Sequence, residues 1–456
     1  MLLIRPEPNR TLWAPWGGGF IEIKENYNSS SDGAIRAAIL VAALGYFVDV
    51  YDIALFGIVR VPSLKDLGFS EERILYDGVT LLNLQMGGML LGGILWGILG
   101  DKLGRVQVLF GSILMYSIAN LANAFVYDMT SYSVCRFLAG LGLAGEIGAG
   151  ITLVSEMMPK NRRGLATTIV ATVGVSGAVA AALVGDFLHW RTAYIVGGFG
   201  GLILLALRVG VYESGMFSAV KDNNEIARGD PTLLFSRGRL WRYLACIGVG
   251  IPMFFFIALL STLAPEIGRA LNTTGELRSA QTVLHYAIGI TIGDVASGLL
   301  SQYLKSRKKV LAVFVASAAI IMTLMVFAQG CTPQYYYKLA FLGGCSIGYW
   351  AVLVTTSAEQ FGTNLRATVA STVPNFVRGA TVPITLLFEG LKPYLGTIES
   401  VRVVGMICYG VAFLGLYSLR ETFHQDLNFV ERRGATNDDA LIDVVNAGEE
   451  RRVGNW

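Results

Sequence analysis

The sequence has little charge and almost no histidine. Asp, Glu, Lys and Arg make up 15% of the 456 residues, whereas 53% are hydrophobic, a balance that excludes an ordinary soluble enzyme. The three histidines, His189, His285 and His424, lack the i+4 partner that a helical zinc site needs. We therefore set aside zinc-dependent catalysis and expect no metal site, no catalytic residues and no cofactor.

Cysteine is also scarce, and two signatures of enzymes and pumps are missing. The sequence has no G-x-x-x-x-G-K-[ST] loop for ATP-driven transport, and it shows no nucleophile–base pair typical of an intramembrane enzyme. The net charge of +3 gives no reason to expect nucleic-acid binding. Five cysteines have no paired spacing and are expected to pack rather than to form disulfides: Cys135, Cys246, Cys331, Cys345 and Cys408.

Long apolar stretches dominate the chain. A helix of about 20 apolar residues crosses a hydrocarbon core of about 30 Å. We predict an all-α membrane protein with twelve transmembrane helices, and Pro374 and Pro383 indicate a kink in the eleventh. The predicted spans are 34–59, 79–99, 106–126, 131–157, 164–187, 192–212, 241–262, 280–303, 310–329, 336–357, 367–391 and 400–419.

The distribution of Lys and Arg predicts the orientation. Basic residues gather in the even-numbered connections, and such residues are retained on the cytoplasmic side. Both termini of this multi-pass protein of the cell (inner) membrane are therefore expected in the cytoplasm, and no cleavable signal peptide is apparent. The basic connections hold Lys102 and Arg105; Lys160, Arg162 and Arg163; Lys221, Arg228, Arg237 and Arg239; and Lys305, Arg307, Lys308 and Lys309.

The two halves of the chain resemble each other. The segment "SEMMPKNRRG" after the fourth span aligns with "AEQFGTNLRA" after the tenth, which places Glu156 opposite Glu359 and Arg163 opposite Arg366, each 203 positions apart. Internal repeats of this kind are common in transporters. The predicted organisation is a cytoplasmic N-terminal segment (1–33), a six-helix bundle (34–212), a cytoplasmic linker (213–240), a second six-helix bundle (241–419) and a cytoplasmic tail (420–456).

The most specific motif is "GILGDKLGRVQVL" at 97–109, between the second and third spans. A polar cluster at such a seam can form in one conformation and break in another, and Asp101 could pair with an arginine of a neighbouring helix. The alternative is that Lys102 and Arg105 only signal topology. The residues expected to gate a conformational change are Gly97, Asp101, Gly104, Arg105, Glu156, Arg163, Glu359 and Arg366.

This loop resembles the signature loop of the major facilitator superfamily, and the resemblance extends over 34–431. The segments "RFLAGLGLAGEIGAGITLVSE" (136–156), "RRG" (162–164) and "RETFHQDLNFVE" (420–431) are similar to the metabolite:proton symporter and sugar-porter branches. The loop at 298–310 departs from the pattern, because Gln302 stands where an acid is expected. The resemblance implies two pseudo-symmetric six-helix bundles around a central site that opens alternately to each side.

Two acids, Asp49 and Asp52, interrupt the apolar first span in "GYFVDVYDIALFG". A charge at the bilayer centre costs about 2.5–3.5 kcal/mol, so these side chains are expected to face a cavity, where one could carry a proton. The resemblance implies that an acid in this region is the coupling site, and the "YD" pattern favours Asp52. The alternative is that one of them lies near the outer interface and pairs with Arg60.

The fourth span supplies two more charges, Arg136 and Glu146. They are ten positions apart and can share a cavity at different depths. The resemblance implies that Arg136, in "RFLAG", takes part in proton coupling, whereas a snorkelling role near the outer interface is the alternative. The proton-coupling set is thus Asp49, Asp52, Arg136 and Glu146.

The predicted substrate-binding residues are Arg378, Asn375, His285 and Gln85. Arg378 follows the Pro374 break and could hold an anion bidentately, or it could neutralise an acid of the first half or lie at the membrane edge. His285 and Gln85 are polar residues within apolar spans, and each alone is more often an inter-helix hydrogen bond.

These observations favour one function and leave two alternatives. We expect a monomeric secondary transporter that couples a small organic solute to protons, with an organic anion such as a carboxylate preferred because of Arg378 and a sugar or polyol also compatible. Its partners would be the solute, protons and the lipid bilayer, with the proton gradient as energy source and no nucleic acid. The alternatives are proton-antiport efflux of amphipathic compounds and a membrane sensor that does not transport.

Overall fold

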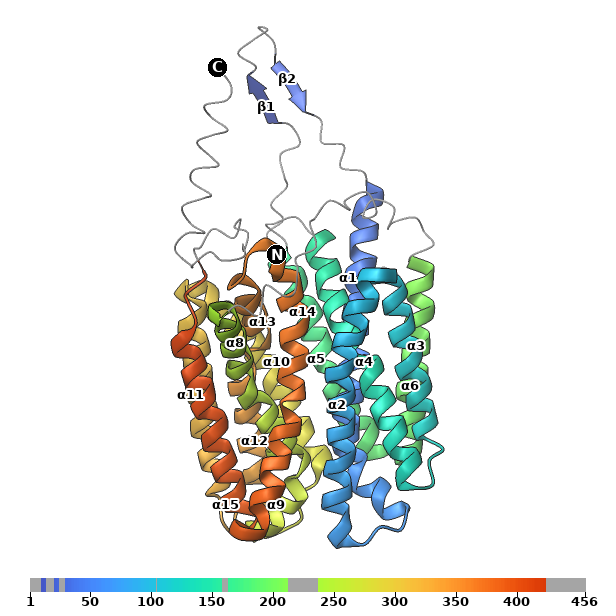
Figure 1. The fold of residues 1–456 in the computed structure, drawn as a ribbon, viewed down its shortest axis with the longest axis vertical. Helices are drawn as coiled ribbons and strands as arrows, with labels where there is room; N and C mark the ends of the chain where they lie inside the picture. The colour runs from blue at the N-terminus through green and yellow to red at the C-terminus, as the bar shows by residue number, and fades with distance from the viewer. Residues whose placement is uncertain are drawn as a thin grey trace.

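The computed structural model describes residues 10–13, 20–23, 29–103, 105–157, 163–211 and 237–423. Two short strands, β1 (Arg10–Trp13) and β2 (Phe20–Ile23), pair antiparallel, with Arg10 opposite Ile23. All the other regular structure in these residues is helical (Figure 1). The all-α prediction is therefore confirmed for the described part of the chain outside this hairpin.

Six long helices form the first half, which we define as residues 29–211. The chain reverses at short connections, and Asp128 begins one helix by accepting a hydrogen bond from the Ser131 amide at 2.8 Å. In Figure 1 these helices, blue to green, lie together on one side of the molecule. They are α1 (Ser29–Asp66), α2 (Glu71–Leu103), α3 (Arg105–Asn123), α4 (Met129–Met157), α5 (Arg163–Phe187) and α6 (Trp190–Val211).

The second half, residues 237–418, is built from more interrupted helices on the other side of the molecule (Figure 1). The break between α14 and α15 at Ala380 lies between the two prolines that predict a kink, and Pro383 has no N–H to donate to the carbonyl four residues earlier. The elements are α8 (Arg237–Phe255), the π-helix η3 (Phe256–Thr262), α9 (Ala264–Ala270), α10 (Ser279–Leu304), α11 (Arg307–Val326), α12 (Pro333–Ile347), α13 (Trp350–Glu359), α14 (Thr363–Gly379) and α15 (Thr381–Ser418).

Within the described part of the chain, eight helical segments are long and apolar enough to cross a membrane. The last of them, Thr368–Ser418, is divided by Gly396, whose φ of 76° lies in the left-handed region that glycine adopts without strain. The eight segments are Ile39–Asp66, Glu71–Trp96, Trp190–Arg208, Gly238–Thr262, Ser279–Leu304, Arg307–Val326, Pro333–Glu359 and Thr368–Ser418.

Glycines let α2 and α4 touch backbone to backbone, and the same arrangement recurs between α10 and α12. A methyl group added at any of these glycines would lie 2.0–2.4 Å from a carbonyl oxygen of the other helix, closer than atoms can approach. In the first half the contacts are Gly140 with Gln85, Gly88 with Phe137 and Gly92 with Leu141. In the second half they are Gly344 with Tyr286, Gly289 with Phe341 and Gly293 with Cys345.

These six contacts correspond one to one. Each α2 residue is 201 positions before its α10 counterpart, as for Gly88 and Gly289, and each α4 residue is 204 positions before its α12 counterpart, as for Gly140 and Gly344. We call each set a glycine seam. The recurrence supports the predicted duplication of the chain, because unrelated bundles would not repeat three contacts in one register.

Candidate functional site

The two acids of α1 lie midway along the helix and are fully buried. Asp49 accepts a hydrogen bond from Arg378 of α14, with 3.1 Å between Oδ2 and Nη2. Arg378 is itself 2% exposed. The pair therefore joins the first half to the second half inside the protein, and Arg378 neutralises an acid of the first half, one of the alternatives raised by the sequence.

Asp52 belongs to a different cluster, which lies wholly in the first half. Its Oδ1 is 3.9 Å from Nη2 of Arg136, a distance beyond hydrogen-bond range. Arg136 is held by three side-chain amide oxygens: Asn120 at 2.7 Å, Asn123 at 3.3 Å and Gln85 at 3.3 Å. We call this group the Arg136 cluster.

The Arg136 guanidinium also stacks on aromatic rings. It lies 4.9 Å from the ring centre of Tyr194 and 5.4 Å from that of Phe56. Its side chain is fully buried, so it does not snorkel to a membrane interface. A buried arginine with this many partners is well stabilised even though its nearest carboxylate is distant.

Gln85 and His285 do not join Arg378. Gln85 binds Arg136, as described above. The His285 Nδ1 lies 2.7 Å from the carbonyl oxygen of Gln281, and its ring stacks on Tyr337 at 5.3 Å between centroids. Of the four predicted substrate residues, the structure thus places only Asn375 and Arg378 one helical turn apart on α14, both facing the first half.

Asn375 and Arg378 line the interface between the halves. The Asn375 amide donates to the carbonyl of Ala144 on α4 at 3.4 Å, and the Arg378 guanidinium carbon lies 6.0 Å from the ring centre of Trp350. Among the described residues, Nε and Nη1 of Arg378 and Nε1 of Trp350 are buried without a hydrogen-bond acceptor. Three N–H donors therefore remain in one region that could bind an anionic oxygen.

Asp294 is a buried acid that our sequence interpretation missed. It lies on α10, is 4% exposed, and its Oδ1 accepts hydrogen bonds from the backbone amides of Trp350 at 2.8 Å and Ala351 at 3.4 Å. The signal was present, because Asp294 is the only charged residue in the predicted span 280–303. Asn120 and Asn123, three positions apart in an apolar span, were a similar signal for the Arg136 cluster.

The predicted gating residues lie largely outside the described part of the chain. Gly104 lies outside the described residues, and so do the surroundings of Gly97, the side chains of Asp101, Arg105, Glu156 and Arg163, and that of Glu146 of the proton-coupling set. In the second half, Glu359 accepts hydrogen bonds from Arg307 at 3.5 Å and from Thr422 at 2.6 Å. Arg366 is half-buried at the start of α14.

Glu421 lies beside Glu359 at this end of the molecule and binds the beginning of α11. It accepts hydrogen bonds from the Ser306 hydroxyl and from the amides of Arg307 at 2.9 Å and Lys308 at 3.3 Å. Partial burial raises the pKa of Glu421, but the hydrogen bonds from Ser306, Arg307 and their neighbours outweigh this effect, so the pKa is lowered overall. Glu421 therefore stabilises this helix start as a carboxylate.

The two halves also meet at the end where α1 finishes and α9 lies (Figure 1), which the predicted orientation places outside the cell. We call it the outer end. Arg60 of α1 forms a buried ion pair with Glu266 of α9 at 2.7 Å and also donates to the carbonyl of Thr262 at 3.2 Å. Arg60 is thus bound to Glu266 and not to Asp49 or Asp52, which corrects the alternative considered for these two acids.

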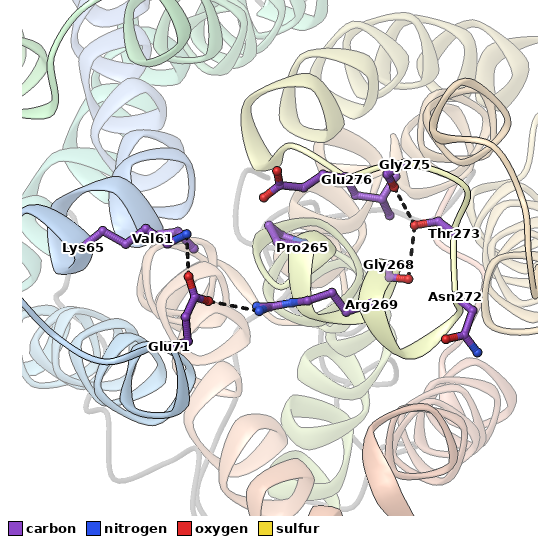
Figure 2. Close-up of a pocket in the computed structure, with 11 residues that line it drawn as sticks. Val61, Lys65, Glu71, Pro265, Gly268, Arg269, Asn272, Thr273, Gly275 and Glu276 are labelled. Atoms are coloured by element: carbon purple, nitrogen blue, oxygen red, sulfur yellow. Dashed lines mark hydrogen bonds and ion pairs between the residues drawn. The ribbon is translucent and has the colours of Figure 1, made fainter.

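A pocket of about 570 Å³ opens beside this ion pair. Figure 2 shows Glu71 between Lys65 and Arg269, with ion-pair distances of 2.7 Å and 3.1 Å. The pocket also includes Val61, which follows Asp49 by 12 residues and so lies about 18 Å further along α1. The pocket is therefore a vestibule at this end of the molecule, separate from the Asp49–Arg378 pair.

The described residues contain no group of three or more His, Cys, Asp and Glu side chains that could hold a metal ion. The five cysteines all lie in the described segments and none forms a disulfide.

Comparison with known proteins shows many related transport proteins, among them the following three. A putative metabolite transport protein of Haemophilus influenzae is 28% identical over 367 residues, covering 75% of this chain and 85% of the relative. The niacin transporter NiaP of Acinetobacter baylyi is 24% identical (72% and 80% covered), and a benzoate transport protein of the same species is 22% identical (72% and 78%). Residues 42–382 match the family described as Major Facilitator Superfamily. The resemblance seen in the sequence is therefore confirmed: this chain is a membrane transporter of the major facilitator superfamily.

Proposed function

We propose that the protein is a proton-coupled symporter for a small organic carboxylate. It would work by alternating access between two six-helix bundles, 34–212 and 241–419, with twelve membrane spans in all. The segment 213–240 would link the bundles, and both termini would lie in the cytoplasm of the cell (inner) membrane. The proton gradient would be the energy source, and no cofactor would be needed.

The observation that carries this proposal is the buried Asp49–Arg378 pair between the halves. Removing one partner of a buried ion pair costs about 3–5 kcal/mol, because the remaining charge is left without compensation. When a proton neutralises Asp49, Arg378 needs another anion, and a substrate carboxylate supplies it. Proton and substrate would therefore bind together, which is the requirement for symport.

The donors around Arg378 support a carboxylate as the ligand. Nε and Nη1 of Arg378 and Nε1 of Trp350 have no acceptor among the described residues. A carboxylate has two oxygens that can accept bonds from a guanidinium in a fork, an arrangement that a neutral sugar or polyol cannot reproduce. The presence of this arginine also disfavours efflux of uncharged amphipathic compounds.

The related transporters point in the same direction. Niacin and benzoate, named for two of them, are both carboxylic acids attached to an aromatic ring. Trp350, which lies next to Arg378 and against Phe254 at 6.1 Å between ring centres, could contact such a ring. Among carboxylates, we therefore favour compact aromatic acids.

The structure also bears on which acid carries the proton. From the sequence, Asp52 was slightly favoured. Asp49 is the stronger candidate because its charge compensates the substrate-binding arginine directly, whereas Asp52 makes only a 3.9 Å contact with Arg136. In this proposal Arg136 and Asp52 form a polar support within the first half.

Purified protein in proteoliposomes tests the proposal. We expect an inward pH gradient to drive accumulation of labelled benzoate or nicotinate well above that in protein-free liposomes, which measure passive diffusion of the neutral acids, and a proton ionophore to abolish it. Benzamide and nicotinamide, which have the same rings without the carboxylate, are the matched controls and should not accumulate. Uptake of the amides at the same rate would remove the anion requirement, and dye extrusion without any carboxylate uptake would favour the efflux alternative.

A further inference from the structure

Asp294 is placed by the glycine seam of the second half. Gly289 and Gly293 of α10 touch the backbone of α12, and a methyl group at Gly348 would lie 2.6 Å from the Gly293 Cα. The residue after Gly293 therefore lies directly beside the chain at Gly348. That residue is Asp294.

The chain leaves the helical conformation at this point. α12 ends at Ile347, Gly348 has ψ of 64°, and Tyr349 has φ of −129° before α13 begins at Trp350. The first amides of a helix have no partner within that helix and need an acceptor, above all inside a membrane protein. Tyr349, the residue before α13, provides no side-chain cap.

Asp294 provides that acceptor from a different helix. Its Oδ1 accepts from the amides of both Trp350 and Ala351, the first two residues of α13. Within the described residues Asp294 forms no ion pair within 4 Å, so charge compensation by a cation does not explain its presence. A carboxylate at a helix N-terminus is instead stabilised by the amides and by the helix dipole.

The capped residue is part of the proposed site. Trp350 is the first residue of α13, and its ring centre lies 6.0 Å from the Arg378 guanidinium carbon and 6.1 Å from the ring centre of Phe254. If the start of α13 loosened, this ring would be the first side chain to shift. The position of the indole relative to Arg378 thus depends on the cap.

We propose that Asp294 is a positioning residue: by capping α13 across the seam, it holds Trp350 beside Arg378 and so sets the affinity for the carboxylate. This inference rests on the proposed function for its effect on transport. Its structural part, that Asp294 fixes Trp350, can be tested without any substrate.

The transport test compares Asp294→Ala, which removes the acceptor, with Asp294→Asn, which keeps a carbonyl oxygen at the same place. With benzoate as the probe, we expect the KM of uptake to rise about tenfold in Asp294→Ala while the maximal rate stays within about twofold. Asp294→Asn should restore the KM to within about threefold of the parent value. The KM effect of Asp294→Ala should vanish in a chain that also carries Trp350→Ala, because both changes act through the same ring.

The substrate-free test uses the emission of Trp350, taken as the difference between each chain and its Trp350→Phe counterpart. Asp294→Ala should shift this emission to longer wavelength and increase its quenching by acrylamide, and Asp294→Asn should match the parent. Unchanged emission and unchanged KM in Asp294→Ala would overturn the inference.

Two further outcomes separate the alternatives. If Asp294→Asn exchanges benzoate normally but cannot accumulate it along a pH gradient, Asp294 carries a proton and the positioning role is wrong. The same comparison tests the inference if Asp294→Ala does not fold. If the parent protein takes up no carboxylate, the proposed function fails, while the Trp350 emission still shows whether Asp294 fixes the indole.

Discussion

The α2–α4 pair of the first half and the α10–α12 pair of the second share their backbone packing but differ in their chemistry. In the first half α4 runs unbroken from Met129 to Met157 and carries Arg136, whereas the corresponding position 204 residues later is Ala340. In the second half the helix breaks after Ile347, and Asp294 stands where the first half has Gly93, 201 residues earlier. The two helix pairs thus share their backbone contacts and differ in the charged groups that they carry.

This difference suggests that the two halves have different roles in transport. The first half holds its arginine inside its own polar cluster and offers an acid, Asp49, to the interface. The second half offers an arginine and an indole, the latter carried by a half-helix that begins inside the protein. We expect proton binding to depend mainly on the first half and substrate recognition mainly on the second.

The largest effect is expected from breaking the ion pair between Asp49 of the first half and Arg378 of the second. Arg378→Ala leaves Asp49 buried without its cation, which should lower the free energy of unfolding by about 3–5 kcal/mol and reduce carboxylate uptake at least about 100-fold. Adding Asp49→Asn to the same chain should restore thermal stability but not uptake. Thermal unfolding in detergent and proteoliposome uptake measure the two effects.

Lys65→Ala is the control for this prediction, because Lys65 and Glu71 are 49% and 58% exposed in their pair and exposed pairs contribute about 0–1 kcal/mol. If the double variant were no more stable than Arg378→Ala, the Asp49–Arg378 pair would not be the source of the lost stability.

Breaking the buried Arg60–Glu266 pair at the outer end should cost a comparable free energy, but only in the conformation that is closed at this end. Glu266→Gln leaves Arg60 without its carboxylate and should favour opening at the outer end, again by about 3–5 kcal/mol against the closed state. In a chain whose native cysteines are replaced by serine, Ala54→Cys, a buried residue on α1, should then react at least about tenfold faster with a membrane-impermeant thiol reagent added outside. The rate of labelling is the measurement.

Glu71→Gln is the matched change at the same end, since Glu71 and Arg269 are both more than half exposed. Its effect on labelling should be small. Equal labelling in the two variants would show that the buried Arg60–Glu266 pair is not what closes the outer end.

The equivalence of the two seams can be tested with a pair of smaller changes. Gly140→Ala and Gly344→Ala each place a methyl group within about 2.0–2.3 Å of a carbonyl oxygen on the partner helix. We expect each to lower the free energy of unfolding by about 1–3 kcal/mol, and by similar amounts. Gly298→Ala, where a methyl group meets nothing within 4 Å, should have no such cost. A large loss at one seam only would mean that the halves are not equivalent even in their packing.

The smallest effect is expected at Glu421. Because its folded-state pKa is depressed, its contribution is fully present above the unfolded-state value of about 4.5 and is lost as the pH falls through the lower folded-state value. Glu421→Gln should therefore lower the melting temperature by a few degrees at pH 7, and the difference should shrink below about pH 4. Melting curves at pH 7 and at about pH 3 check this, and a difference that grew at low pH would contradict it.

Much of this molecule could be anticipated from its sequence, but the pairings could not. Apolar runs predict helices because the bilayer requires them, and charges inside those runs drew attention to Asp49, Asp52, Arg136 and Arg378. Their partners depend on how helices far apart in the chain meet: Asp49 and Arg378 are 329 positions apart. Gln85 was predicted to bind substrate because nothing in its local sequence indicates that it faces Arg136.

The break before Trp350 was hidden for a different reason. The segment "GCSIGYW" contains no proline and continues the apolar pattern, so it reads as an uninterrupted span. The amides freed by the interruption donate to Asp294, 56 positions earlier, and a cap supplied by another helix leaves no local signature. Conversely, the break at Ala380 was predictable, because Pro374 and Pro383 act on their own helices.

The glycine seams also determine where this protein can deform. A contact made of backbone atoms has no rotamers to exchange, so neither seam can yield by rearranging side chains. Conformational change is therefore expected at the boundary between the halves, where long side chains such as Arg60 and Arg378 make the contacts. Substitutions at that boundary could therefore change the transported solute during evolution, while the helix packing inside each half stays the same.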